Sequence, residues 1–129
     1  MRHQQNKLLE LNTGAKSKWV FMRMQLSSLI RAWKITTTPK RAKVLKAYTD
    51  EFFSRLLSFD AKYKDEKEAK REAIKYVKSV IYGEEEGKKV IETLWAKYRD
   101  EKRVSGFTTS YRLGFRVGDA APKIMLKLA

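Results

Sequence analysis

The chain contains no cysteine, and its 129 residues include one histidine and two prolines. The lack of cysteine excludes a disulfide framework, a thiolate metal site and a cysteine nucleophile. The one histidine, His3, has no companion ligands, so we predict no metal site. No apolar run approaches the roughly 18 residues of a membrane-spanning helix. Residues 1–7 lack the apolar core of a secretory signal, and we therefore expect a cytoplasmic protein.

Catalytic motifs are also missing. The sequence has no nucleophile elbow and no phosphate-cradling glycine loop, although it contains six glycines. Most acidic residues alternate with lysines and arginines in the middle of the chain, where carboxylates are normally solvated. The run Glu84-Glu85-Glu86 suits the start of a helix and requires no metal. We therefore predict that the protein is not an enzyme and uses no cofactor and no small-molecule substrate.

Positive charge is abundant, and most of the excess lies in the first two-fifths of the chain, with a smaller excess at the other end. The net charge is +14, to which residues 1–49 contribute eleven Lys or Arg and a single acid. Residues 50–104 have fourteen basic and thirteen acidic side chains, and residues 105–129 have four basic and one acidic. Such an excess repels itself unless a polyanion neutralises it, and nucleic acid is the obvious polyanion. We expect the basic ends to form a binding face and the middle to face solvent.

The spacing of apolar residues predicts helices in the first four-fifths of the chain. Residues 1–16 are polar and aperiodic, which indicates an extended arm. Apolar residues recur at helical spacing over about 17–32, 39–58, 66–82 and 84–99, with a β-branched strand at 35–38 and a loop at 60–65. The expected buried stripe of the first helix comprises Trp19, Met22, Leu26, Leu29, Ile30 and Trp33.

From residue 107 onward the apolar residues alternate with period two, which predicts a hairpin. One face is expected to pack on the helices and contains Phe107, Thr109, Tyr111, Leu113 and Phe115. The other face is expected to carry the charges of Arg112, Arg116, Lys123 and Lys127. The alternation favours core positions for Phe107 and Tyr111, and stacking on RNA bases is the alternative.

The segment between the first two helices combines threonines with basic side chains. Thr38 suits the N-cap of the second helix, and Pro39 suits its first position. Lys40, Arg41 and Lys43 then fall in the first turn, where each cation opposes the helix macrodipole at a cost of roughly a few tenths of a kcal/mol. A phosphate bound at the helix start would resolve this conflict. Long side chains that extend into solvent are the alternative.

Six blocks of the sequence carry a resemblance to a known family. They are residues 1–3 (Met-Arg-His), 11–12, 22–23, 29–30, 35–43 (Ile-Thr-Thr-Thr-Pro-Lys-Arg-Ala-Lys) and 114–122 (Gly-Phe-Arg-Val-Gly-Asp-Ala-Ala-Pro). Together they resemble the bacterial ribosomal protein L17 family, and the two long blocks are the specific ones. The chain departs from the family where arginines are usual, at Gln4, Gln5, Thr13 and Gly14, and at Thr109, where a Gly-Gly-Tyr-Thr-Arg run is common.

The resemblance implies an α+β fold of helix, strand, three helices and two strands, with a small three-stranded mixed sheet packed on the helices. The length of the chain fits one domain, which we place at 17–129 behind the arm at 1–16. The resemblance also implies a structural protein of the large ribosomal subunit, bound to large-subunit rRNA near the exit of the peptide tunnel. Neighbouring ribosomal proteins would then be further partners.

The candidate RNA-binding residues lie in the arm and its continuation to Lys18, in a patch that joins Arg23 of the first helix to the start of the second helix, and in the hairpin. They are Arg2, His3, Lys7, Asn12, Lys16, Lys18, Arg23, Thr36, Thr37, Thr38, Lys40, Arg41, Lys43, Arg112 and Arg116. Lys and Arg contact phosphates, and hydroxyls and helix N–H groups add to those contacts. Two other classes stay open: a nucleic-acid-binding regulator outside the ribosome, and a membrane-surface protein that uses Trp19, Phe21 and Trp33.

Overall fold

A computed structural model describes residues 17–129, so the predicted arm lies outside the described residues. Its elements are helix α1 (Lys18–Ala32), strand β1 (Lys34–Thr37), helices α2 (Pro39–Lys62), α3 (Glu66–Val80) and α4 (Glu84–Lys89), the π-helical segment η2 (Val90–Leu94), helix α5 (Trp95–Asp100), and strands β2 (Thr108–Phe115) and β3 (Pro122–Leu128). Because α4, η2 and α5 are continuous, the predicted α+β order of helix, strand, three helices and two strands is confirmed. Within residues 17–129 no helix has the length and apolar character needed to cross a membrane.

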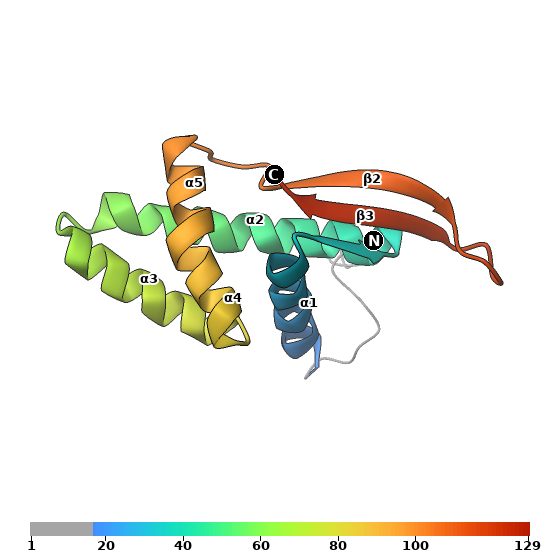
Figure 1. Ribbon diagram of the computed structural model, residues 1–129, viewed down its shortest axis with the longest axis horizontal. Helices are drawn as coiled ribbons and strands as arrows, with labels where there is room; N and C mark the ends of the chain where they lie inside the picture. Colours follow the sequence, from blue (N-terminus) through green and yellow to red (C-terminus); the bar gives the residue numbers. More distant parts are fainter. Residues whose placement is uncertain (1–16) are drawn as a thin grey trace, which may run out of the picture.

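Helix α2 runs along the long axis of the molecule and organises the other elements (Figure 1). The sheet lies over its first half, and α3 folds back from its far end. We predicted that this helix ends near Ser58, but it continues to Lys62. Asp60 in the additional turn forms an ion pair of 3.1 Å with Arg99 of α5, and Phe59 packs on Tyr76 of α3. These tertiary contacts hold a turn in helical form that its composition assigns to a loop.

The three strands form a sheet in the order β1-β3-β2, and both pairings are antiparallel. The predicted mixed sheet is therefore wrong. Strands β1 and β2 run in the same direction, but β3 lies between them, so no parallel pair forms. β2 is consequently an edge strand, and its far side has no partner strand among the described residues.

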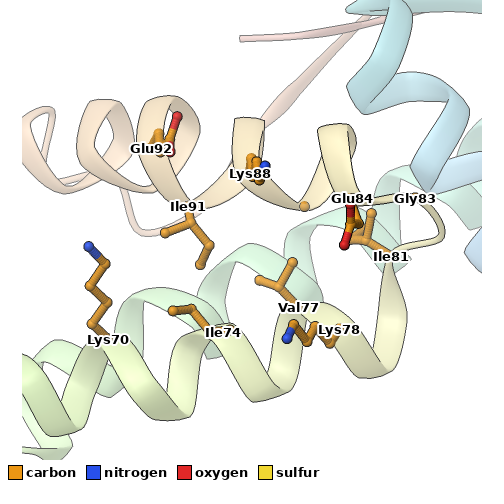
Figure 2. A pocket seen from close by; sticks show the side chains of 11 residues that line it. Lys70, Ile74, Val77, Lys78, Ile81, Gly83, Glu84, Lys88, Ile91 and Glu92 are labelled. Atoms are coloured by element: carbon orange, nitrogen blue, oxygen red, sulfur yellow. The ribbon is translucent and has the colours of Figure 1, made fainter.

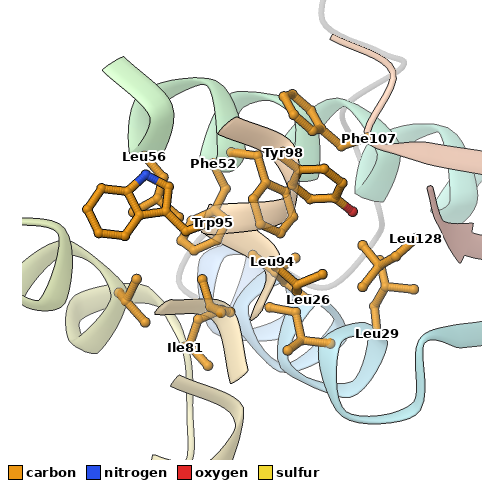
Figure 3. Close-up of a cluster of buried hydrophobic side chains, with 14 of the residues drawn as sticks. Leu26, Leu29, Phe52, Leu56, Ile81, Leu94, Trp95, Tyr98, Phe107 and Leu128 are labelled. Carbon is orange, nitrogen blue, oxygen red and sulfur yellow. The ribbon is translucent and has the colours of Figure 1, made fainter. Parts of the chain in front are cut away.

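The core lies where α1, α2, α5 and the sheet meet (Figure 3). Leu26 and Leu29 of α1, Phe52 of α2 and Leu128 of β3 are among its buried members. The predicted apolar stripe of α1 is confirmed at Met22, Leu26, Leu29 and Ile30. It is wrong at Trp19, which is 59% exposed and lies in the first turn of α1, one turn before the buried stripe begins.

The last helix differs from its prediction by a π-helical segment in its middle. The N–H of Trp95 donates to the carbonyl of Val90, five residues back, so η2 holds one residue more than a regular turn. A single extra residue changes which side chains face inward, and here Leu94, Trp95 and Tyr98 are all buried. Apolar spacing alone does not distinguish this bulge from a regular helix.

The register of the hairpin reverses the predicted faces of β2. Ser110 lies opposite the buried Leu126, whereas Tyr111 lies opposite Met125 on the other face. Residues directly opposite in an antiparallel pair share a face, so Ser110 and Arg112 face the helices and Tyr111 faces away. The phase differs because Phe107 and Thr108 are both buried, and Thr108 begins the strand opposite Leu128.

An irregularity between Arg112 and Gly114 then shifts the alternation by one residue. Beyond it, Phe115 lies opposite Pro122 on the helix side of the sheet, although its side chain is 69% exposed. The predicted core positions for Tyr111, Leu113 and Phe115 are therefore wrong. Only the beginning of the hairpin lies over the core, and the rest extends beyond it (Figure 1).

Two polar contacts join the end of α1 to α4. Arg31 Nε lies 2.5 Å from Glu86 Oε1, and this hydrogen bond lowers the pKa of the nearly buried Glu86 carboxyl. Lys89 Nζ donates to the carbonyl of Ile30 at 2.6 Å and lies 4.0 Å from the ring centroid of Trp33. A cation at the last carbonyls of a helix compensates their partial negative charge. Arg31 and Lys89 are therefore structural residues of this junction.

Gly83 is required at this junction, and we predict that Gly83→Ala destabilises the fold. Its φ is 99°, and an added Cβ would lie 2.1 Å from Glu86 Oε2. A backbone of this positive φ alone costs a residue with a Cβ about 1–3 kcal/mol. The matched control is Gly87→Ala, whose Cβ would make an ordinary 3.6 Å contact with Val77 and which we expect to stabilise α4 by about 0.5–1 kcal/mol. Urea unfolding measures the free energy of unfolding of the two variants. Changes of equal sign and size in both would contradict a specific requirement for glycine at position 83.

The raised pKa of the Tyr98 hydroxyl leads to a prediction of how the stability of the fold changes at alkaline pH. Burial raises the pKa of its hydroxyl to about 12 from the model-compound value of 10.0. The neutral form is favoured in the folded state, so this stability is present below pH 10 and is lost as the pH rises from 10 to 12. We expect the free energy of unfolding of Tyr98→Phe to lie below that of the unsubstituted protein by a similar amount at pH 8 and pH 9. Above pH 10 the free energy of unfolding of the variant should fall less steeply with pH than that of the unsubstituted protein. Urea unfolding across this range checks it, and parallel pH profiles would exclude Tyr98 as the titrating group.

Candidate nucleic-acid interface

A groove of about 810 Å³ lies between the first turns of α2 and the hairpin. Helix α2 contributes Pro39, Ala42, Lys43 and Lys46, and the strands contribute Ser110, Tyr111, Arg112, Gly114, Phe115, Pro122, Lys123, Ile124 and Leu126. Four of these lining residues are basic and none is acidic. Within a partly enclosed groove, charges of one sign reinforce one another and attract a polyanion.

Local structure aligns the basic side chains of α2 along this groove. Ala42, Val44 and Leu45 are buried, which fixes the rotation of the helix and leaves Lys43 and Lys46 exposed. Residues three apart share a helix face, so the two lysines project together toward the hairpin. Arg112 faces the same groove because the strand register turns it to the helix side of the sheet.

The start of α2 adds backbone donors to this surface. Thr38 occupies the N-cap position with extended backbone angles, and Pro39 occupies the first helical position, as predicted. The Thr38 side chain makes no capping hydrogen bond, so the first-turn N–H groups keep their capacity to bind an anion. The N–H groups at the start of α2 therefore receive no hydrogen bond acceptor from the Thr38 side chain, although threonine is a favoured N-cap residue.

The cations of the junction have no acidic partners of their own. Within residues 17–129 the ion pairs involve Arg31, Lys75, Arg99, Arg103 and Arg116, and none involves Lys40, Arg41, Lys43 or Arg112. Arg41 is exposed, and its guanidinium lies 5.1 Å from the ring centroid of Phe21, which restricts its position. Thr36 is exposed, and Thr37 and Thr38 are half-buried, all within the segment that enters α2.

The two predicted residues of α1 lie apart from the groove. Arg23 is half-buried, donates to the carbonyl of Val80 at 2.9 Å and stacks at 4.2 Å on Tyr82. It is two residues from Phe21, which turns it about 200° around α1, away from Arg41. The structure therefore does not bring Arg23 to the α2 junction, where we had grouped it. Lys18 lies in the first turn of α1, with Nζ 5.7 Å from the Trp19 ring.

Arg116 lies at the tip of the hairpin, beyond the end of β2. Its guanidinium donates to both carboxylate oxygens of Asp119, through Nε at 2.9 Å to Oδ1 and through Nη2 to Oδ2. This hydrogen bonding holds the pKa of Asp119 well below its usual range. The expectation that Arg116 shares a polar sheet face with Arg112 is therefore wrong, because Arg112 faces the helices and Arg116 braces the turn.

Sequence reasoning missed part of the groove and named residues outside it. Lys46, Lys123 and Phe115 line the groove and were not among the candidates. Lys46 follows Lys43 by one helical turn, and that spacing was the available signal. The remaining candidates, Arg2, His3, Lys7, Asn12 and Lys16, fall outside the described residues.

A second hollow lies between α3 and α4, and its character is different (Figure 2). Ile74, Val77, Ile81 and Ile91 form its apolar floor. Its rim holds both signs of charge, from Lys70, Lys78, Lys88, Glu84 and Glu92. A rim of mixed charge does not select a polyanion. Across residues 17–129, no three His, Asp or Glu side chains gather into a group that would hold a metal ion.

Comparison with known proteins gives an independent indication of the family. The family model for Ribosomal protein L17 matches residues 21–129, which include the groove and both long sequence blocks. The large ribosomal subunit protein bL17 of Desulforudis audaxviator is 35% identical over 107 residues, or 83% of this chain and 85% of the relative.

Two further relatives agree. Large ribosomal subunit protein bL17 of Syntrophotalea carbinolica is 32% identical over 128 residues, covering 99% of this chain and 74% of the relative. The same protein of Syntrophomonas wolfei is 32% identical over 107 residues, covering 83% and 84%. The family match spans most of the chain at an identity near one third, and on this evidence the protein belongs, as a divergent member, to the ribosomal protein L17 family.

Proposed function

We propose that this protein is a structural constituent of the large ribosomal subunit and binds large-subunit rRNA through the groove between α2 and the hairpin. The observation that carries the proposal is the set of four basic and no acidic side chains that line this groove. The relatives are named as large ribosomal subunit proteins, which supports ribosomal RNA as the polyanion. Membership of a ribosomal protein family supports the expectation that the chain is not an enzyme.

The groove suits the sugar–phosphate backbone of an RNA helix. Helical RNA is recognised mainly by its shape and by phosphate and 2′-hydroxyl contacts. Lys43 and Lys46 on one wall and Arg112 on the other would contact phosphates from two sides. Lys40, Arg41 and the first-turn N–H groups of α2 would extend these contacts beyond the groove. The arm, with Arg2, His3, Lys7, Asn12 and Lys16, would continue the same interface.

The mixed-charge helices support an orientation on the particle. Helices α3 and α4 lie at the opposite end of α2 from the outer part of the hairpin (Figure 1). Since their six acidic residues nearly balance their seven basic ones, these two helices would face away from RNA, toward solvent or neighbouring large-subunit proteins. The proposed position near the exit of the peptide tunnel rests on the family resemblance alone.

The groove predicts a specific effect on RNA affinity. Replacing Lys43 and Arg112 with alanine should weaken binding to fragments of large-subunit RNA and lower the salt slope by about two released counterions. The matched control replaces two exposed lysines of α3, Lys70 and Lys78, and should leave the slope unchanged. Lys89 is unsuitable as a control because its Nζ donates a hydrogen bond to the carbonyl of Ile30 near the end of α1. Equal losses in the two double variants would show that net charge, and not the groove, determines binding.

Assembly separates the proposed function from a regulatory one. The tagged chain, expressed in a bacterium, should co-sediment with large ribosomal particles at moderate salt, because many phosphate contacts form at once. Anionic vesicles should not carry it when they float in a density gradient. Recovery on chromosomal DNA, with none on ribosomal particles, would instead support a nucleic-acid-binding regulator and contradict the proposal.

A further inference from the structure

One face of the sheet is turned away from all the helices of residues 17–129 (Figure 1). Ile35, Leu126 and Leu128 point toward the helices, and side chains alternate along a strand, so their neighbours point the opposite way. Lys34 and Thr36 of β1, Met125 and Lys127 of β3, and Thr109 and Tyr111 of β2 form this outer face.

The strand register arranges the outer face in two rows. One row crosses the sheet through Thr36, Met125 and Tyr111, and the next crosses it through Lys34, Lys127 and Thr109. Directly opposite residues have Cβ atoms about 4.5–5.5 Å apart. The Tyr111 ring therefore stands beside Met125, one row from two lysines.

Tyr111 is exceptional among the six tyrosines of the chain. Tyr48, Tyr63, Tyr76 and Tyr98 each lie near another aromatic ring, and Tyr82 lies under Arg23. Within residues 17–129 no aromatic ring or cation lies against Tyr111, and its side chain is 47% exposed. An exposed aromatic ring on a sheet is a surface on which an unpaired base stacks.

The charge of the outer face fits the same ligand. None of the three strands contains an acidic residue. Lys34 and Lys127 take part in none of the ion pairs of the described residues. Proteins that bind single-stranded nucleic acid combine such cations, which follow the backbone, with an aromatic ring that stacks on a base.

The outer face is also continuous with the proposed RNA groove. Arg112 faces the groove, and Tyr111, its neighbour in the chain, borders the same groove while the strand register turns its side chain to the outer face. Because β2 is the edge of the sheet, a strand of RNA that leaves the groove reaches Tyr111 by passing around one edge. An RNA helix in the groove followed by an unpaired segment would meet both surfaces in turn.

We propose that the outer face of the sheet binds an unpaired segment of RNA, with a base stacked on Tyr111 and its phosphates contacted by Lys34 and Lys127. This inference rests on the proposed function and names a second RNA class for the same protein. It assigns the helix side of β2 to paired RNA and the outer side to unpaired RNA.

The test compares two RNA probes on the full chain: an eight-nucleotide oligoadenylate and a self-complementary RNA duplex. Tyr111→Leu should weaken oligoadenylate binding between about 5-fold and 150-fold, since stacking on an aromatic ring contributes roughly 1–3 kcal/mol per base. Duplex binding should change less than about 2-fold. Tyr111→Phe keeps the ring and should bind oligoadenylate as the unsubstituted protein does. The groove variant with Lys43 and Arg112 replaced should show the opposite pattern and lose duplex affinity.

Several outcomes would overturn the proposal. Unchanged oligoadenylate binding by a folded Tyr111→Leu, checked by circular dichroism, would remove the stacking role. Equal losses from Tyr111→Phe and Tyr111→Leu would do the same. If oligoglutamate bound and only that binding needed Tyr111, the face would belong to an acidic protein partner. Failure of the proposed function is distinct, since the unsubstituted chain would then bind neither RNA probe and would not co-sediment with ribosomal particles.

Discussion

The aromatic cluster of Phe53, Tyr98 and Phe107 is the contact on which the rest of the structure depends. Phe53 lies 5.0 Å from Tyr98 and 5.4 Å from Phe107, measured between ring centroids, and Tyr98 lies 5.1 Å from Phe107. The three rings come from α2, α5 and the residue before β2, and all are fully buried. The two contacts of Tyr98 are edge-to-face, and this packing adds a preferred geometry to the apolar burial. It holds the sheet over the first half of α2, and the basic groove exists only because of that placement.

Charge is then separated along α2 by the same arrangement. The start of α2 meets the hairpin, where cations predominate, and its end meets α3 and α5, where both signs are present. Two cations do not follow this division, because Arg31 and Lys89 join α1 to α4. Burial lowers the pKa of Lys89 because desolvation disfavours the charged ammonium, and the nearby Glu86 carboxylate opposes this shift. The basic residues of this protein thus have two different roles, and only position in the fold distinguishes them.

Much of the fold was predictable from local patterns, and the errors occurred where tertiary contacts outweigh them. The helix over Lys18–Ala32 and the Thr38-Pro39 start of α2 follow from apolar spacing and capping preferences. The extra turn of α2, the π-helical segment and the irregularity in β2 leave no periodic signal, because each adjusts a few residues to a neighbouring element. The phase of β2 shows this most clearly. Its apolar residues alternate regularly, yet the strand begins at the buried Thr108, and this shift turns Tyr111 outward.

The sequence by itself determined the class of fold, the family and the uneven distribution of positive charge along the chain. Capping residues, periodicity and local net charge are properties of short segments and can be read without the tertiary structure. It also identified the start of α2 as basic and suited to an anion. Only the tertiary structure decided which cations share a surface: Lys43, Lys46 and Arg112 line one groove, whereas Arg23 and Arg116 are engaged elsewhere. The reason is physical. The direction of a side chain depends on strand register and helix rotation, and both are set by what the opposite side of the element buries.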